Sequence, residues 1–104
     1  MSQIRVPLSV FDDKVQAHRV DAGPEGVCLV RIVDRYFAIS DRCSHAEVSL
    51  SQGDVDPDDC SIECWKHGSA FSLLDGEPQS LPATVPVPVY PVAVDGDELV
   101  VELP

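Results

Sequence analysis

The chain has 104 residues and a mass of 11.3 kDa, which predicts a single domain with a single hydrophobic core. Its 18 acidic residues against 7 basic ones give a formal net charge of −11, so we expect no nucleic-acid partner. No stretch reaches the roughly 20 apolar residues that span a bilayer, and the start lacks a signal peptide, so we expect a cytoplasmic protein without a membrane partner.

The acidic residues gather in clusters at Asp12-Asp13, from Asp54 to Asp59 and from Asp95 to Glu98. This charge either only keeps the protein soluble or also steers it toward a basic docking patch on a partner. Both interpretations stay open, because net charge informs on association rather than on fold.

The composition and the first patterns along the chain predict an all-β fold. Nine prolines, six glycines and frequent valines disfavour long helices. Residues 4–10 alternate apolar and polar side chains and predict a first strand, which Pro7 places at a sheet edge. After a loop at 21–26, the β-rich run 27–40 predicts a hairpin with a tight turn at Asp34-Arg35.

The stretch from about residue 41 to residue 76 is rich in polar residues and turn formers, and it contains three cysteines and two histidines. We expect an inserted functional subdomain there, within a single domain that spans 1–104. Short strands are predicted at 61–64 and 69–74, followed by a turn at Asp75-Gly76. Helix signals are weak, and residues 46–50 form at most about one turn.

The last part of the chain predicts an edge strand and a hairpin. Pro86 and Pro88 lie two residues apart, so their missing N–H groups fall on the same side of a strand, which must be an edge. Val85, Val87 and Val89 alternate with them and predict a stripe that faces the core. Asp95-Gly96 lies between Val-rich runs and predicts a type I′ turn before a strand at 98–103.

Four potential metal ligands form two similar pairs, Cys43-Ser44-His45 and Cys64-Trp65-Lys66-His67, with 18 residues between them. Each pair offers one thiolate and one imidazole. Together they could give two thiolates to one iron and two imidazoles to the other iron of a [2Fe–2S] cluster, or all four ligands to one tetrahedral zinc. Ligand identity alone leaves both centres open.

Two features of the surrounding sequence favour the cluster. The one-residue gap between Cys43 and His45 is tight for two ligands of the same tetrahedral ion, whereas neighbouring ligands of a binuclear cluster can bind different irons. Gly53, Gly68 and Gly76 supply sharp turns that would let backbone N–H groups approach the sulfides.

The residues around both pairs resemble the Rieske ferredoxins over nearly the whole chain. The similarity lies in residues 43–53, 62–71, Gly76, Pro78, Leu81-Pro82 and 90–92. It extends to the ferredoxin components of bacterial aromatic-ring dioxygenases and to small actinobacterial Rieske proteins linked to iron–sulfur assembly. The resemblance implies a Rieske fold, in which an antiparallel β-sandwich or barrel forms the base and a cluster-binding subdomain at about 41–76 is inserted into it.

The same resemblance implies the ligands and the role. Cys43 and Cys64 would bind an inner iron, and His45 and His67 an outer iron near the surface. The protein would carry one electron at a time from a flavin-dependent ferredoxin reductase to a terminal non-haem iron oxygenase, with docking near the two histidines. The potential of the cluster would fall as the ring N–H groups of these histidines lose protons with rising pH.

Departures from the relatives in respiratory complexes bear on the potential. Those relatives carry a disulfide that braces the cluster loops, and Val48 and Lys66 stand at its positions here. Ser69 matches a serine that donates a hydrogen bond to the cluster, but Phe71 replaces a tyrosine and has no hydroxyl. The resemblance therefore implies an unbraced cluster at the low end of the Rieske range, roughly −150 mV.

The chain itself is not expected to be an enzyme. His18 is the only further histidine, too few for the mononuclear iron site of an oxygenase, and no Gly-rich nucleotide motif indicates a reductase. A zinc-binding interaction module and a Rieske protein of iron–sulfur homeostasis or redox sensing stay as alternatives.

Several other residues carry expectations of their own. We expect Cys28 in the core, Cys60 in a structural role near the cluster loop and His18 at the surface. Trp65 either shields the cluster or forms part of a docking face. Pro78 and Leu81-Pro82 resemble a loop that covers the cluster in this family, with a plain surface loop as the alternative.

Overall fold

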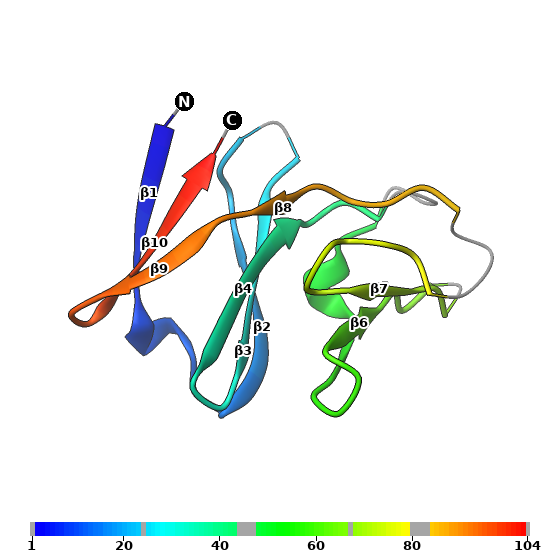
Figure 1. Cartoon of the computed structure of the whole chain (residues 1–104), viewed down its shortest axis with the longest axis horizontal. Helices are drawn as coiled ribbons and strands as arrows, with labels where there is room; N and C mark the ends of the chain where they lie inside the picture. The colour runs from blue at the N-terminus through cyan, green and yellow to red at the C-terminus, as the bar shows by residue number, and fades with distance from the viewer. Residues whose placement is uncertain (1, 24, 44–47, 67, 80–83, 104) are drawn as a thin grey trace.

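The computed structural model describes residues 2–23, 25–43, 48–66, 68–79 and 84–103, which form antiparallel strands and two short 3-10 helices (Figure 1). The strands are β1 (Ser2–Pro7), β2 (Val15–Val20), β3 (Val27–Ile32), β4 (Arg35–Ser40), β5 (Asp54–Asp56), β6 (Ser61–Glu63), β7 (Ala70–Ser72), β8 (Val89–Tyr90), β9 (Val92–Asp95) and β10 (Glu98–Leu103). The 3-10 helices are η1 (Leu8–Val10) and η2 (Leu50–Gln52).

The strands form three antiparallel sheets, which confirms the predicted all-β class. Their orders are β1-β10-β9, β2-β3-β4-β8 and β5-β6-β7. We call the first the terminal sheet, the second the middle sheet and the third the small sheet. In Figure 1 the two ends of the chain lie side by side on the terminal sheet, where Ser2 pairs with Leu103, and the small sheet lies at the opposite end of the molecule.

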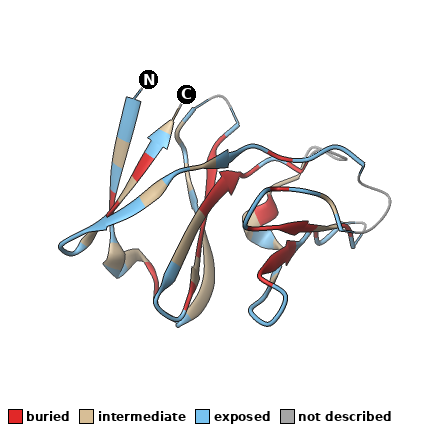
Figure 2. Ribbon diagram, viewed as in Figure 1, coloured by how far each residue is buried: buried red, intermediate tan, exposed pale blue. Residues whose placement is uncertain are grey.

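Strand β3, near the centre of the middle sheet, is buried on both of its faces. Successive side chains of a strand point to opposite faces, and those of β3 alternate between two hydrophobic clusters. Val27 and Leu29 pack toward the terminal sheet, whereas Cys28, Val30 and Ile32 pack with residues of the small sheet. The nearly continuous apolar run of β3 is therefore explained by its contacts with two hydrophobic cores, one on each face. The buried residues are red at the centre of Figure 2.

Both predicted hairpins are present, with their turns shifted by one residue. The first turns at Val33-Asp34 instead of Asp34-Arg35, because Ile32 pairs directly with Arg35. Val33 takes a left-handed φ of 58°, which a β-branched residue rarely adopts. It is held there by its N–H, which donates to the carbonyl of Lys14 at 2.6 Å, so a tertiary contact overrides the strand preference of valine.

The second hairpin joins β9 and β10 through Gly96-Asp97, since Asp95 pairs with Glu98. A type I′ turn needs positive φ at both central residues, but only Gly96, with φ of 64°, has it. The predicted type I′ turn at Asp95-Gly96 is thus wrong in position and type, and a glycine in the first central position is typical of type II′.

Other boundaries also differ from the predictions. The predicted strand at 4–10 is β1 followed by η1, and β1 lies at a sheet edge as Pro7 indicated. Strand β2 was missed because its alternation is interrupted by His18 and Arg19, and β5 was missed because it is the acidic tripeptide Asp54–Asp56. The short strands predicted at 61–64 and 69–74 are confirmed as β6 and β7.

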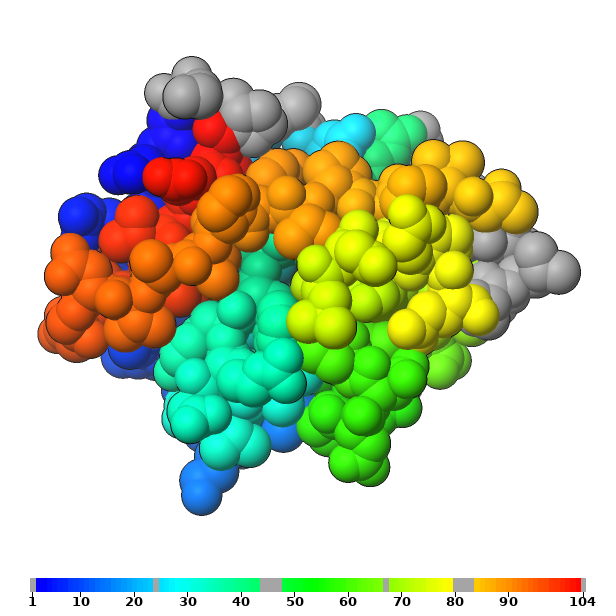
Figure 3. All heavy atoms as spheres, viewed as in Figure 1, coloured from blue at the N-terminus to red at the C-terminus, as the bar shows by residue number. Residues whose placement is uncertain are grey.

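The segment before β8 connects the small sheet to the rest of the fold. Figure 3 shows it, in orange, lying across this face of the molecule, over the junction between the small sheet and the middle sheet. Strand β8 is an edge of the middle sheet, as the paired prolines predicted, and the Pro88 carbonyl accepts the N–H of Ser40 at 2.9 Å. The predicted valine stripe is wrong, however: Val87 is buried, but Val85 and Val89 are 57% and 38% exposed.

Gly76 anchors this crossing segment. Its φ is 75°, its N–H donates to the Ser72 carbonyl at 2.8 Å and its carbonyl accepts the N–H of Val87 at 3.0 Å. A Cβ at this position would overlap the carbonyl oxygen of Val87. Among the residues that the structure describes, no helix has the length and apolarity needed to cross a membrane.

Gly76→Ala should destabilise the protein more than Gly96→Ala does. Both glycines have positive φ, so each variant should lose about 1–2 kcal/mol through left-handed backbone strain. Gly96 has open space around it, whereas the new methyl group at Gly76 must displace backbone, which should add about 2 kcal/mol or more. Urea unfolding of the two variants, followed by circular dichroism, tests this; equal losses would contradict the close packing at Gly76.

Candidate metal centre

The structure brings Cys43 and Cys64 into one buried cluster of side chains. Cys43 lies in the segment that follows β4, and Cys64 directly follows β6. Their exposed fractions are 2% and 0%, and both belong to the core between the middle and small sheets. Two cysteines from separate parts of the chain are therefore held in the same water-excluded region.

Each of these cysteines begins a tight loop of the same size. The N–H of Cys43 donates to the carbonyl of Val48 at 3.1 Å, five residues later, and the N–H of Cys64 donates to the carbonyl of Ser69 at 2.6 Å, also five residues later. We call these the first loop (43–48) and the second loop (64–69). The sequence pairs a cysteine with a histidine inside each loop, so the two halves of the motif correspond to two equivalent loops.

The second loop requires Gly68. Its φ is 75°, and its N–H donates to the Cys64 carbonyl at 3.0 Å, which turns the chain back toward β7. Residues Trp65 and Lys66 are exposed, with Trp65 at 54%, although the preceding Cys64 is fully buried. The loop thus passes from the core to the surface within one residue.

His45 and His67 lie outside the described residues, as do Leu81 and Pro82. The assignment of the two histidines as ligands therefore remains a prediction. So does the boundary of the cluster-binding subdomain at about 41–76, within which the small sheet lies. Pro78 is described, and it forms an isolated bridge with Phe71.

The surroundings of the two thiols are apolar. Leu50, Ile62, Phe71 and Leu73 are at most 1% exposed and belong to the same core cluster. Phe71 brings no hydroxyl, whereas the Ser69 side chain is buried nearby in the second loop. Because an isolated thiolate is costly to bury, two thiolates in this environment fit a metal centre that compensates their charge. The donor set by itself suits both an iron–sulfur cluster and zinc.

The comparison with known protein families decides between them. The family described as Rieske [2Fe-2S] domain matches residues 7–91. The chain belongs to this family. Its metal centre is therefore a Rieske-type [2Fe–2S] cluster, and the zinc alternative is set aside.

Several similar proteins are ferredoxins of dioxygenase systems. The 3-phenylpropionate/cinnamic acid dioxygenase ferredoxin subunit of Escherichia coli K12 is 39% identical over 89 residues, which cover 86% of this chain and 82% of that protein. The ferredoxin of carbazole 1,9a-dioxygenase from Nocardioides aromaticivorans IC177 superposes with a TM-score of 0.88 at 35% identity, over 97% of both chains.

A further similar structure contains both a ferredoxin and an oxygenase. A complex of reduced oxygenase and oxidised ferredoxin in carbazole 1,9a-dioxygenase includes a chain that matches this protein with a TM-score of 0.86 and 35% identity, over 95% of this chain and all of that one. Like these relatives, this Rieske protein is a one-electron carrier and not a catalytic subunit, as the sequence predicted.

Cys28, Cys60 and His18, which are not proposed as ligands, make packing or hydrogen-bond contacts. All four cysteines are free, and Cys28 and Cys60 are buried in the same core as the candidate ligands. The carbonyl of Cys60 accepts the N–H of Leu73 at 2.9 Å, which ties the β5–β6 turn to the end of β7. His18 is partly exposed, as expected for a surface position, and its ring also packs edge-on against Phe11 at 6.3 Å between centroids.

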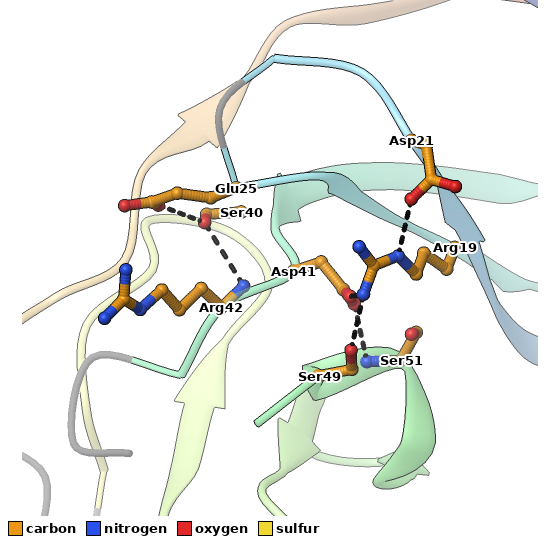
Figure 4. Close-up of polar contacts among 8 residues, drawn as sticks. All are labelled: Arg19, Asp21, Glu25, Ser40, Asp41, Arg42, Ser49 and Ser51. Atoms are coloured by element: carbon orange, nitrogen blue, oxygen red, sulfur yellow. Dashed lines mark hydrogen bonds and ion pairs between the residues drawn. The ribbon is translucent and has the colours of Figure 1, made fainter. Parts of the chain in front are cut away.

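A polar network beside the first loop was not found from the sequence. It consists of Arg19, Asp41 and Ser49, with Asp41 only 1% exposed (Figure 4). One indication of this network is present in the sequence, the charged residue Asp41 between the strand 35–40 and Cys43. Its partner Arg19, however, is 22 residues away in the sequence. Only the pairing of β2 with β3 brings Arg19 to this position.

Cys28 should resist alkylation in the folded holoprotein. Burial raises the pKa of its thiol well above the ordinary value, and the negative charge of Asp41 raises it further. The reactive thiolate is therefore scarce at any pH at which the protein is folded. Iodoacetamide at pH 8.5, followed by peptide mass spectrometry, should leave Cys28 unmodified until urea unfolds the chain; rapid labelling of folded protein would contradict its core position.

Proposed function

We propose that Cys43, His45, Cys64 and His67 hold the Rieske cluster, and that the protein carries electrons from a flavin-dependent ferredoxin reductase to a terminal non-haem iron oxygenase. The observation that carries this proposal is the pair of equivalent six-residue loops, each of which begins at a buried cysteine and contains a histidine in its sequence. Cys43 and Cys64 would ligate the inner iron, and His45 and His67 the outer one.

Buried residues of the chain would exclude water from the cluster, and exposed residues would contact the partner proteins. When bound, a Rieske cluster takes up and releases one electron. Leu50, Ile62 and Phe71 exclude water from the thiol side of the site, which lowers the local dielectric. Trp65 and Lys66 expose the second loop to solvent beside His67, which supports docking of partners near the two histidines.

The distribution of acidic residues supports electrostatic steering of a basic partner. Asp54, Asp56, Asp58 and Asp59 are exposed on β5 and the following turn, in the same small sheet that leads into Cys64. Such a one-signed surface speeds the encounter with a partner of opposite charge, and the effect weakens as salt is added.

We also propose a cytoplasmic location. The support is that none of the four cysteines forms a disulfide, although two of them, Cys28 and Cys60, have no proposed role as ligands. Free structural thiols are typical of a reducing compartment.

Replacement of the proposed thiol ligands should abolish the cluster, whereas replacement of Cys60 should not. Cys43→Ser and Cys64→Ser each remove a thiolate that iron requires, so the purified proteins should lack the visible absorbance and the rhombic EPR signal of a reduced Rieske centre. Cys60→Ser is the matched control, because Cys60 is also buried in this core.

The histidines have a control of the same kind. His45→Ala and His67→Ala should lose the Rieske EPR signal, and His18→Gln should retain it, with iron and sulfide content measured in each protein. A Rieske signal in any of the four ligand variants would contradict the assignment of that residue.

The reduced holoprotein should pass electrons to an oxygenase of the class found with its relatives. In stopped-flow mixing with the oxygenase components of 3-phenylpropionate/cinnamic acid dioxygenase and carbazole 1,9a-dioxygenase, at least one should oxidise it at a rate that rises with oxygenase concentration and falls with salt. No transfer to either would contradict the proposed oxygenase partner and favour the role in iron–sulfur homeostasis.

The same assay tests the docking face. Trp65→Ala should slow the transfer by about tenfold, since exposed aromatic residues contribute strongly to the centre of protein interfaces. Val94→Ala is the control, because Val94 is similarly exposed, at 53%, but lies on β9 in the terminal sheet. Equal effects of both substitutions would contradict docking beside the second loop.

A further inference from the structure

We propose that Arg19 is a positioning residue for the cluster, which acts through Asp41 and Ser49 to hold Cys43 in its ligand-binding position. This inference rests on the proposed function only in taking Cys43 as a ligand. It concerns residues of β2 and of the segment after β4, outside both candidate ligand pairs.

The first loop is closed at its neck by Asp41. We define the neck as Asp41 and Arg42 on one side and residues 49–51 on the other. The carbonyl of Asp41 accepts the N–H of Leu50 at 2.6 Å, and its carboxylate oxygen Oδ1 accepts the N–H of Ser51 at 2.9 Å. One residue therefore joins the two ends of the segment that carries Cys43.

Arg19 reaches both sides of this neck with a single nitrogen. Its Nη1 donates to Asp41 Oδ2 at 3.1 Å and to the Ser49 hydroxyl at 2.8 Å, and its Nε donates to Asp21 at 2.9 Å (Figure 4). Arg19 belongs to β2, which is hydrogen-bonded into the middle sheet. The neck is thus fastened to the rigid part of the fold through one guanidinium group.

Asp41 needs this partner because it is buried. Its side chain is 1% exposed, and both of its oxygens are used by the contacts described. A carboxylate removed from water is costly unless it is hydrogen-bonded and paired with a positive charge. Arg19, which is half-exposed, is the cation that the structure places beside it, so the neck depends on Arg19 more than its exposure suggests.

The two loops differ in how much backbone pairing supports them. The second loop is flanked by β6 and β7, which pair at Ser61↔Ser72, Ile62↔Phe71 and Glu63↔Ala70. Among the described residues, the pairing across the neck of the first loop consists of the isolated bridge Arg42↔Ser49 and the backbone bonds of Cys43 and Leu50 given above. The side chains of Asp41 and Arg19 therefore help to hold this neck, and because all four cysteines are free, no disulfide does so.

The test compares Arg19→Met with Arg5→Met in the holoprotein. Arg5 also forms ion pairs between distant parts of the chain, with Asp95 and Glu98, and lies in the terminal sheet. The rate of iron release to a ferrous chelator should rise by about tenfold or more in Arg19→Met, which is the scale on which outer contacts act on metal sites. It should change by less than about twofold in Arg5→Met.

A spectroscopic measurement distinguishes positioning from general stability. Arg19→Met should broaden the EPR signal of the reduced cluster and shift its midpoint potential, since the first loop would no longer hold a single geometry; Arg5→Met should leave both as in the parent protein. Wild-type rates and spectra in Arg19→Met, or equal effects in both variants, would overturn the proposal.

Two milder variants decide the matter if Arg19→Met fails to assemble a cluster. Arg19→Lys keeps the positive charge and should recover part of the wild-type rate of iron release, whereas Asp41→Asn keeps the shape but loses the charge and should resemble Arg19→Met. Wild-type behaviour of both variants would overturn the proposal. Absence of a Rieske EPR signal from the parent protein would instead contradict the proposed function.

Discussion

The burial of β3 on both faces is the constraint on which the rest of the molecule depends. Because β3 alternates its side chains between two cores, one strand fixes the terminal sheet on one face and the small sheet on the other. The candidate ligands Cys43 and Cys64 belong to the second of these cores. The positions of these two cysteines are thus set by the same apolar alternation that holds the fold together.

The two cysteines proposed as ligands begin two loops of equal size that are supported in different ways. In each, the cysteine N–H donates to a carbonyl five residues later, and the cysteine side chain lies in the core. The second loop is a continuation of a β-hairpin. The first loop lies between the middle sheet and η2. There the contact between the buried Asp41 carboxylate and the Arg19 guanidinium group adds to the bridge Arg42↔Ser49, whereas the second loop is supported by the β6–β7 pairing.

Charge is used in two distinct ways in this acidic chain. The exposed carboxylates of the small sheet are proposed to act over a distance on an approaching partner, an effect that salt weakens. Asp41 is buried and acts only on the groups that touch it, so its effect is on the geometry of the first loop. The net charge of −11 reflects the exposed carboxylates but gives no indication that Asp41 is buried.

The sequence by itself determined the all-β class, the two hairpins, the edge position of the proline-bearing strand and the spacing that pairs each cysteine with a histidine, because these follow from local alternation, turn formers and ligand chemistry. It misplaced both turns, missed β2 and β5 and predicted a valine stripe of which only Val87 is buried. The β9–β10 turn and β5 belong to local hairpins whose exact register the sequence pattern does not fix. The Val33 turn and the burial of Val87 depend on contacts between distant segments, which only the tertiary structure decided. The burial of Asp41 beside Arg19 is of the same kind, since no pattern in the sequence indicates that strand pairing will bring the two together.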